Sequence, residues 1–257
     1  MKIRFLGAHN TETRDTRLSG LLVNGVLALD AGSLTSGLTL SEQLGIKAVL
    51  VTHQHYDHIK DLPLLGMNHF LNHSSFSVYC LAETGDVISK YLMDGNLYSE
   101  FLKKDEKRNA VIKLNTVDPY LQMQIEGYSV TPVPVSHGVP SAGYLVSAGE
   151  GKSLFYTGDT GPGLSACFEQ ISSNLLITEV TSSDKYLDFC KEKGHMCPAL
   201  LKEELLRHRD MRGYIPDVVT VHMNKMLEDK MRMELQAVSE ELGISIEMAF
   251  EGKELEI

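Results

Sequence analysis

Short apolar runs that stop abruptly at polar residues mark the first half of the chain. The runs at 3–7 (IRFLG), 21–32 (LLVNGVLALDAG) and 48–55 (AVLVTHQH) end in Gly, Asp or His, as strands do where they reach a turn. The middle run is interrupted by Asn24-Gly25, a pair favoured in two-residue hairpin turns. The pattern therefore predicts a β-rich first half with a hairpin at 21–32.

Helical spacing separates these runs. Apolar positions repeat at helical intervals over Thr35–Leu44 and again over Ile59–Leu71. A longer helical stretch is predicted at about 84–108, and its charged end, KKDEKR at 103–108, is most simply a solvated face. This stretch would form a helical insert between two β-rich halves.

The second half returns to strands and then alternates with helices. Four β-like segments follow the insert: NAVIKLNTV, LQMQIEGYSVTPVPVSH, AGYLVSAGEGKSLFYTGD and NLLITEV. A helix at 198–208, a strand in DVVTVH, a helix at 226–242 and a strand in ISIEMAF complete the pattern. Because no repeat or linker divides the chain, we predict a single domain over 1–257 with a layered α/β fold and two sheets inside.

Composition narrows the class of protein. The chain has 257 residues, 43% of them hydrophobic, and a formal charge of −10, from 24 Lys and Arg against 34 Asp and Glu. An acidic chain is poorly suited to holding long nucleic acid by charge, so none is expected as a partner. The four cysteines form no CxxC pair, and neither a signal peptide nor a membrane-length apolar run is visible. We expect a cytoplasmic protein with no membrane partner.

The strongest chemical signal is the segment 52–58, Thr-His-Gln-His-Tyr-Asp-His. A strand ends here, and His53 and His55 share a face because strand side chains repeat every two residues. Asp57 and His58 follow the turn and can reach a neighbouring point. Imidazole and carboxylate ligands suit Zn, Fe, Mn or Co. A group of exposed loop histidines is the alternative, but three histidines beside an acid at a strand end favour a metal site.

Three later strand ends repeat this pattern with one residue each. His137 follows VPVS, Asp159 follows LFYTG, and His222 follows VVTV. Each alone is more simply a structural histidine or a turn-forming aspartate. Functional residues gather on the loops at strand ends, however, so the four ends together reinforce the interpretation.

This ordered set resembles the metallo-β-lactamase superfamily. The resemblance implies a four-layer αββα sandwich with two divalent metal ions at one edge, with zinc as the first expectation and manganese or iron as alternatives. One ion would be held by His53, His55 and His137, the other by Asp57, His58 and His222, with Asp159 as the bridging ligand.

Within the superfamily, the chain resembles the phosphodiesterase branch, which contains ribonuclease Z and the class II cyclic-nucleotide phosphodiesterases. The resemblance rests on IKDLPLLG, HGVPSAGY, YTGDTGP, LLITEVT and GHMCPALLKEELL, and on the lack of a cysteine at a matching strand end. Only 21 residues separate His137 from Asp159, too few for the tRNA-grasping arm usual in bacterial ribonuclease Z. A small cyclic nucleotide or similar phosphodiester is therefore the expected substrate, cleaved by a hydroxide that two metal ions activate.

Other functions remain as alternatives. A ribonuclease Z-like nuclease would need a basic path for RNA, and a lactone or thioester hydrolase would share the same metal chemistry with a different pocket. A metal-binding sensor or oxygen-binding protein is a third alternative. His55 argues against it, because redox di-iron members of the superfamily usually have Glu at that position.

The resemblance also suggests catalytic roles outside the metal ligands. Asp57 would take a proton from the attacking water, and His195, in GHMC, would act as the general acid for the leaving group. Glu179 would orient His195 or a ligand. Without the resemblance, His195 reads as a capping or surface residue and Glu179 as a strand-end surface residue. Asp30 would support the site or simply form a turn.

The remaining histidines and the methionines have simpler interpretations. His9 either reaches the site or caps a turn, and His69 and His73 either face the substrate opening or serve as ordinary helix residues. His208 is expected on the surface. The methionines at 223, 226, 231 and 233 are most simply core residues, although the Met-rich C-terminal helix, or the insert at 84–108, could supply a homodimer surface.

Overall fold

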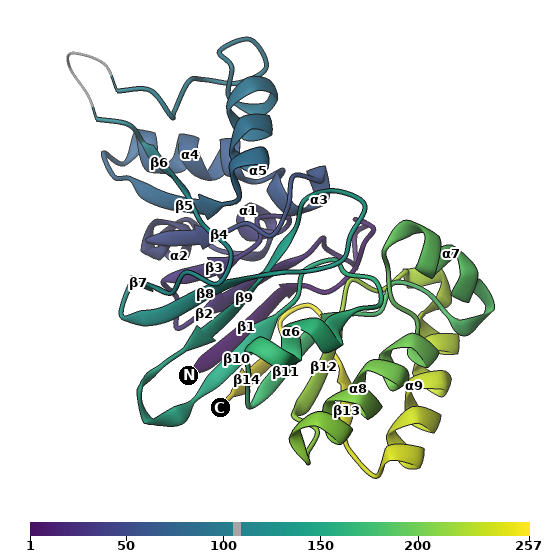
Figure 1. The fold of residues 1–257 in the computed structure, drawn as a ribbon. Coiled ribbons are helices and arrows are strands. Elements are labelled where there is room, and N and C mark those ends of the chain that lie inside the picture. The colour runs from purple at the N-terminus through teal and green to yellow at the C-terminus, as the bar shows by residue number, and fades with distance from the viewer. Residues whose placement is uncertain (105–108) are drawn as a thin grey trace.

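Two seven-stranded sheets form the centre of the molecule (Figure 1). The computed structural model describes residues 1–104 and 109–257. Sheet 1 has the strand order β14 (Glu254–Glu256), β1 (Lys2–Gly7), β2 (Gly20–Val23), β3 (Leu27–Leu29), β4 (Ala48–Leu50), β5 (Phe76–Cys80) and β6 (Ile112–Thr116). Sheet 2 has the order β13 (Ile246–Met248), β12 (Asp217–Val221), β11 (Leu175–Glu179), β10 (Ser153–Tyr156), β9 (Ala142–Ser147), β8 (Tyr128–Pro134) and β7 (Met123–Ile125).

Each sheet is mixed. Strands β3 to β6 run parallel in sheet 1, and β10 to β13 run parallel in sheet 2. The other neighbouring pairs are antiparallel, including β2 and β3, which form the hairpin expected at Asn24-Gly25. Parallel strands present their carboxyl ends at one edge of a sheet, so the residues that follow them are brought close together.

Alternation along the strands of sheet 1 builds two cores. Leu27 and Leu29 of β3 face a cluster between the two sheets, whereas Ala28 faces a second cluster under the helices of sheet 1. In the same way Leu50 of β4 points inward and Val49 points outward. Because both faces of these strands are buried, they read as continuous apolar runs.

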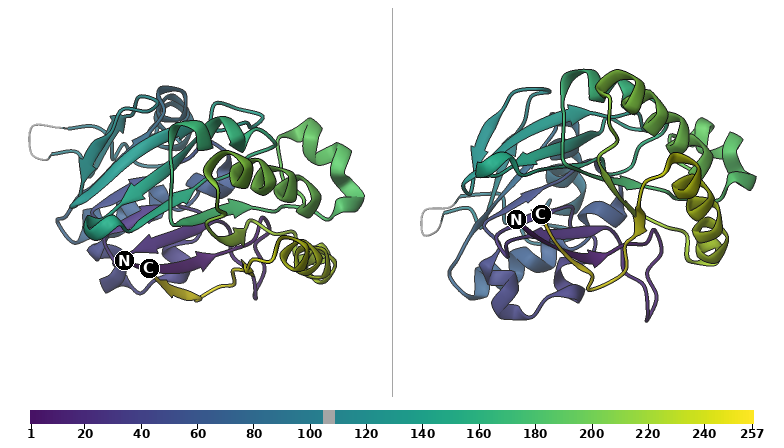
Figure 2. Two further views of the ribbon diagram at one scale, coloured as in Figure 1. Left: turned by 60° about the horizontal axis from the view of Figure 1, so that its bottom comes forward. Right: turned by 90° about the horizontal axis from the view of Figure 1, so that it is seen from below.

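Helices cover the outer face of each sheet (Figures 1 and 2). Those of sheet 1 are α1 (Leu34–Gly37), α2 (Leu40–Gly45), α3 (Tyr56–Ile59), α4 (Leu62–Leu71) and α5 (Ala82–Val87), which continues into the π-helix η1 (Ile88–Leu92). Those of sheet 2 are α6 (Leu164–Gln170), α7 (Leu187–Lys193), α8 (Pro198–Arg212) and α9 (Glu228–Leu242), with 3-10 turns η2 (Gly149–Gly151), η3 (Asp184–Tyr186) and η4 (Lys225–Leu227). The predicted four-layer αββα sandwich is confirmed.

The helical predictions need two corrections. The single helix predicted at 35–44 is two helices, because Thr39 caps the second one through a capping box with Glu42. The predicted helix at 84–108 ends at Leu92, because the Asp94 side chain accepts hydrogen bonds from the backbone N–H groups of residues 96 and 97 and so forms a turn. The last part of the charged run KKDEKR, at 105–108, lies outside the described residues.

The two ends of the chain lie side by side (Figure 2). Strand β1 pairs with β14, and the terminal amino group of Met1 donates to the carbonyl oxygen of Ile257 at 2.6 Å. Within residues 1–104 and 109–257, no helix has the length and apolar character needed to cross a membrane.

Candidate metal centre

Strand ends from both sheets supply the polar cluster. In sheet 1, β4 runs into His53, then His55 precedes α3, and α3 carries Asp57 and His58. In sheet 2, the cluster receives one residue after each of three strands: His137 follows β8, Asp159 follows β10 and His222 follows β12. The structure thus brings together all seven residues that the sequence analysis predicted as metal ligands.

One group of possible ligands contains His53, His55, His137 and Asp159, whose ligand atoms all lie within 4.8 Å of one another. His55 Nδ1 is 2.9 Å from His53 Nε2 and 3.2 Å from His137 Nε2. The Asp159 Oδ2 atom lies 3.9 Å from the Nε2 atoms of His53 and His137. These atoms surround one point to which each ring offers a nitrogen.

A second group contains Asp57, His58, Asp159 and His222, again within 4.8 Å of one another. His58 Nε2 is 3.2 Å from Asp159 Oδ1, and His222 Nε2 is 3.1 Å from Asp57 Oδ2. Asp159 therefore faces the first group with Oδ2 and the second group with Oδ1. A carboxylate in this position is suited to bridging two cations.

Unsatisfied buried atoms support a cation at this cluster. His58 Nε2 and Asp159 Oδ1 are buried and have no hydrogen-bond partner among the described residues. Buried polar atoms are normally paired, so each such atom needs an explanation. Divalent ions take neutral imidazole nitrogens and carboxylate oxygens as ligands, so the atoms present fit a metal ion.

In four of the five histidines that are candidate ligands, the ring nitrogen that faces away from the cluster has a partner. Thr52 Oγ1 lies 3.0 Å from His53 Nδ1, and the carbonyl oxygen of Gly194 lies 2.8 Å from His137 Nδ1. The other two contacts are Asp30 Oδ2 to His58 Nδ1 at 2.7 Å and Thr181 Oγ1 to His222 Nδ1 at 2.8 Å. Acceptors on Nδ1 fix the tautomer in which Nε2 has a free lone pair for a metal.

Close backbone packing sets the positions of these residues. Gly158, just before Asp159, has φ +61, and a Cβ atom there would lie 2.6 Å from Thr52 Cγ2 in the other sheet. Gly194 ends α7 with φ +72, and a Cβ atom there would lie 2.9 Å from His137 Cα. Only glycine meets both conditions. Asp30 and His222 also have positive φ, 60° and 61°, conformations that persist where the surroundings impose them.

Asp30 is a buried acceptor beneath the second group. Its carboxylate accepts hydrogen bonds from Thr52 N at 2.8 Å and Tyr156 OH at 2.8 Å, in addition to its contact with His58. The sequence left open whether Asp30 supports the site or forms a turn, and the structure shows that it contacts a candidate ligand directly.

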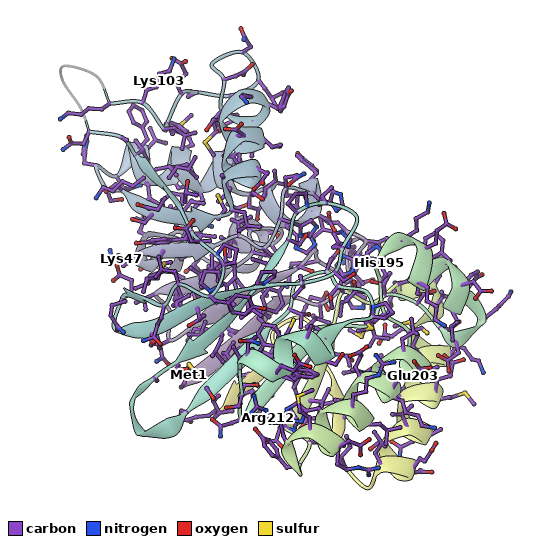
Figure 3. The ribbon with its side chains drawn as sticks, viewed as in Figure 1. Met1, Lys47, Lys103, His195, Glu203 and Arg212 are labelled. Carbon is purple, nitrogen blue, oxygen red and sulfur yellow. The ribbon has the colours of Figure 1, made fainter. Side chains whose placement is uncertain are left out.

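His195 follows α7 by two residues (Figure 3), and its ring lies 5.1 Å from that of His137, centroid to centroid. Its Nδ1 is 2.7 Å from Oε1 of Glu179, a fully buried carboxylate that also accepts from Met196 N at 3.2 Å. The rings of His195 and His222 are stacked with centroids 5.9 Å apart. His195 is therefore held by Glu179 on one side and faces the cluster on the other.

Thr181 is a site residue that the sequence analysis missed. Its hydroxyl is 2.5 Å from Glu179 Oε2 and 2.8 Å from His222 Nδ1. By donating to Glu179 and accepting from His222, it connects the residue that holds His195 with a candidate metal ligand. A signal was present, because residues 179 and 181 are two positions apart at the end of β11 and so share a face.

The neighbouring charges shift the pKa values of the clustered residues in different directions. Burial opposes protonation of His58, but the carboxylates of Asp159 and Asp30 outweigh burial and raise the His58 pKa well above its usual value. Burial likewise works against ionisation of Asp159, yet His222 and His58 hold the pKa of that carboxyl well below its ordinary range. For His53, burial and the neighbouring His58 lower the pKa well below its usual value, which keeps the ring neutral.

His195 has a different balance. Burial lowers its pKa, but the hydrogen bond to Glu179 and the charge of that carboxylate raise the pKa to about 9. An imidazole with this pKa carries a proton at neutral pH, which is the state a general acid requires.

The remaining histidines lie outside the ligand groups. His9 is buried between Glu251, 2.7 Å from its Nδ1, and Glu228, 3.3 Å from its Nε2. His69 is buried and donates to the Gln43 carbonyl oxygen, and His73 is exposed. The surface position predicted for His208 is wrong: it is buried, contacts the Tyr214 carbonyl oxygen at 2.8 Å and packs on Phe168.

The prediction that all four methionines are core residues is half wrong. Met223 and Met231 are fully buried, whereas Met226 is 90% exposed and Met233 is 69% exposed. The buried face of α9 carries Met231, Leu235 and Val238 at helical spacing, and Met233 lies off that face.

Comparisons with known proteins agree with this geometry. The family model described as beta-lactamase superfamily domain matches residues 22–223. A 3′,5′-cyclic-nucleotide phosphodiesterase from Aliivibrio fischeri is 26% identical over 251 residues, which cover 78% of this chain and 73% of that protein. A ribonuclease Z from Staphylococcus carnosus is 30% identical over 159 residues, which cover 58% of this chain and 50% of that protein.

Known structures share the fold. The metallo-beta-lactamase fold protein YhfI from Bacillus subtilis superimposes with a TM-score of 0.78 at 17% identity, over 99% of this chain and 98% of that one. The family match at 22–223 includes every strand end that contributes to the cluster. The chain therefore belongs to the beta-lactamase superfamily, as a metal-binding hydrolase of the metallo-β-lactamase fold.

Proposed function

We propose that this hydrolase is a phosphodiesterase that cleaves a small cyclic nucleotide or a similar phosphodiester with the help of two divalent metal ions. The observation that carries the proposal is the pair of ligand groups that share Asp159, with His195 held beside them by Glu179. Phosphoryl transfer needs positive charge on the phosphoryl oxygens and a proton for the leaving oxygen. This arrangement provides a place for each.

The ligand assignment follows the two groups. His53, His55 and His137 would hold one ion, Asp57, His58 and His222 would hold the other, and Asp159 would bridge them. We propose zinc as the native metal, because an imidazole-rich set of this kind suits zinc, and manganese or iron as alternatives. Bound ions of this type lower the pKa of water towards neutrality and neutralise charge on phosphoryl oxygens.

The protein groups supply the proton transfers. The Oδ2 atom of Asp57 lies 3.1 Å from His222 Nε2 and 3.4 Å from His58 Nε2. Burial works against ionisation of Asp57, but these two histidines hold the pKa of its carboxyl well below the ordinary range. The ionised carboxylate could therefore accept a proton from the attacking water. His195 would donate a proton to the leaving oxygen, and Glu179 would hold the ring so that Nε2 faces the substrate. Asp57, His195 and Glu179 are thus the proposed catalytic set.

The names of the relatives suggest two substrate classes, cyclic nucleotides and RNA, and two features of this chain favour the cyclic nucleotides. The residues between His137 and Asp159 form β9, η2 and β10, a simple connection that leaves little chain for an RNA-binding arm. The formal charge of −10 also disfavours a long polyanion. A ribonuclease Z-like activity is the second candidate, because a ribonuclease Z is among the relatives. A lactone or thioester hydrolase would need the same centre with a different pocket.

We further propose a cytoplasmic protein, since all four cysteines are free and buried, which fits a reducing compartment. A homodimer is proposed as well, with α9, which carries the exposed Met233, as one candidate surface.

A substrate panel tests the proposed function. Protein loaded with zinc or manganese should release nucleoside monophosphate from cyclic mononucleotides. His55→Ala should abolish this release. His73→Ala, which changes an exposed histidine between α4 and β5, should leave it unchanged. Turnover of pre-tRNA but not of cyclic nucleotides would support the ribonuclease alternative. No turnover of cyclic nucleotides, bis(p-nitrophenyl) phosphate or pre-tRNA by metal-loaded protein would refute both.

A further inference from the structure

A groove of about 350 Å³ lies between η4 and the segment formed by η3 and α7. It is lined by Ser182, Tyr186, Phe189, Asn224, Met226 and Leu227. Two of these lining residues are close in sequence to the candidate site: Ser182 comes directly after Thr181, and Asn224 comes two residues after His222. Its volume falls within the range of roughly 300–1,000 Å³ that is typical of small-molecule sites.

The groove is lined by two exposed aromatic side chains and an exposed methionine. Phe189 of α7 is 49% exposed, Tyr186 of η3 is 39% exposed, and Met226 of η4 is 90% exposed. Two aromatic rings and a thioether suit a flat aromatic ligand, because rings stack on rings and sulfur packs well against ring edges. The Lys185 ammonium group lies 5.3 Å from the centroid of the Tyr186 ring, adding a positive charge at this wall.

The groove also offers hydrogen bonds. The Asn224 side-chain oxygen accepts from Met226 N at 2.9 Å, which leaves the side-chain NH₂ group as a donor. The Ser182 hydroxyl is a second polar group among the lining residues. A nucleobase has an aromatic face together with ring nitrogens or carbonyl oxygens that accept such donors.

Both walls are fixed in place. Asp184, at the start of η3, donates its N–H to Glu234 of α9 at 3.0 Å and accepts from Ala199 N of α8 at 2.7 Å. The opposite wall is held by Asn224, whose N–H donates to the Thr181 carbonyl oxygen at 3.2 Å. A groove whose walls are already ordered loses little conformational entropy when a ligand binds.

The groove that includes the candidate ligand His137 has a different lining. It has a volume of about 520 Å³ and is lined by His137, three prolines and small or aliphatic residues, without Phe, Tyr or Trp among its described lining residues. Of these two grooves, the one lined by Phe189 and Tyr186 combines exposed aromatic rings with side-chain hydrogen-bond donors. A third groove, lined by Tyr56, Tyr98 and Lys60, has a volume of only about 190 Å³.

Resting on the proposed phosphodiesterase function, we propose that this groove is a subsite for the nucleobase of a nucleotide substrate, with Phe189 and Tyr186 as the stacking residues. The phosphate would lie at the metal-ligand cluster, and the base would lie between η3–α7 and η4. The subsite would make the enzyme selective for nucleotides over phosphodiesters that have no aromatic ring.

Two matched substrates test the subsite on the metal-loaded protein. One is adenosine 3′,5′-cyclic phosphate, and the other is the same cyclic ribose phosphate with a methoxy group in place of adenine. Phe189→Ala should raise KM for the adenosine compound about tenfold, as expected for the loss of one stacking partner, with kcat within about twofold. KM for the base-free compound should not change.

Two further variants make the result specific. Phe189→Tyr keeps a ring and should retain the low KM, whereas Tyr91→Ala, which removes an exposed ring from η1, should have no effect on either substrate. Equal changes in KM for both substrates, or no change for either, would overturn the subsite while leaving the phosphodiesterase proposal intact.

A binding measurement separates this inference from the proposed function. If neither substrate is hydrolysed, titration calorimetry with adenosine monophosphate and ribose 5-phosphate still decides the question. About tenfold tighter binding of the adenosine compound, lost in Phe189→Ala, would support the subsite, and equal affinities would refute it. The oligomeric state, measured by analytical ultracentrifugation, shows whether a second copy of the chain covers the groove. A dimer that Phe189→Ala converts to a monomer would mean that a second copy covers the groove, and would overturn the inference.

Discussion

The two sheets contribute to the cluster in opposite ways. Sheet 1 supplies His53, His55, Asp57 and His58 from a single stretch of six residues. Sheet 2 supplies His137, Asp159 and His222 from three strand ends that are far apart in the sequence. The first contribution is set by local chain geometry. The second depends on strand order and register, and therefore on the complete sheet.

This difference places the interface between the sheets inside the site. Each of the two groups proposed to hold a metal ion combines residues of sheet 1 with residues of sheet 2, and Asp159 belongs to both groups. At the same point Thr52 of sheet 1 meets Gly158 of sheet 2 with no room for a side chain. Metal affinity should therefore report how well the two sheets are held together, as well as which ligands are present.

The largest expected effect comes from Asp159→Asn, which weakens the one ligand common to both groups. Because two cations would lose a shared negative charge, we expect kcat/KM to fall at least about a thousandfold and at least one metal ion to be lost per chain. Elemental analysis of the purified variant and kinetics on a cyclic nucleotide would measure both. Asp217→Asn, an exposed change at the start of β12, is the control. Full metal content with unchanged kinetics in Asp159→Asn would contradict the shared role.

The next effect concerns His195, which comes from a loop beyond sheet 2. His195→Gln should lower kcat by about 10²- to 10⁴-fold, the usual contribution of a general acid. The pKa of His195 is raised to about 9, so the protonated form, and with it the wild-type rate, should decline as pH rises through that region. Nearby cations would move this limb to lower pH, because they disfavour the imidazolium form.

A pH–rate profile from pH 6 to 10 would detect this limb. The His195→Gln profile should lack it, because glutamine does not titrate. A variant that keeps the alkaline limb, or that loses metal rather than rate, would assign the limb to another group.

The smallest effects are expected from the residues that hold a candidate histidine ligand in each sheet. Asp30→Asn changes the buried acceptor under His58, and Thr181→Val removes the hydroxyl that contacts His222. Loss of such partners lowers metal affinity about 10- to 100-fold. We expect Asp30→Asn near the upper value, because it also removes a buried charge, and Thr181→Val near the lower value, because valine has nearly the same shape.

Metal competition with a chelator would measure these two affinities, and thermal unfolding of the metal-free proteins would separate them from lost stability. Equal affinity losses would mean that the two sheets support their ligands equally. A lower melting temperature without any change in metal affinity would leave both residues with a purely structural role.

The comparison also explains which features the sequence revealed. The cluster at 52–58 was visible because three histidines and an aspartate stand close together, and the continuous apolar runs at 21–32 and 48–55 predicted strands, which the structure buries on both faces. His137, Asp159 and His222 were recognisable only as strand ends in a series. The proximity of Asp159 and His222 depends on parallel pairing of β10, β11 and β12, and that of His137 on antiparallel pairing of β8, β9 and β10. Local sequence patterns do not contain these long-range pairings.

The misjudged positions have a common cause. The charged neighbours of His208 indicated a surface position, yet Leu201, Leu205 and His208 lie on one face of α8, and tertiary packing buries that face. Buried histidines also differ in their partners. His69 bonds through both ring nitrogens to other protein atoms, whereas His58 keeps Nε2 unsatisfied. That unsatisfied nitrogen, which only a structure reveals, separates a candidate ligand from a structural histidine.

Strands β13 and β14 lie only a short turn apart in the sequence, yet they form the edges of different sheets. During synthesis, β1 and β12 would each keep an open edge until residues 246–256 leave the ribosome. Open edges are templates for pairing between chains. This short segment therefore covers the longer strands β1 and β12 with edge strands of only three residues each, and a chain that lacks it would present longer open edges prone to aggregation.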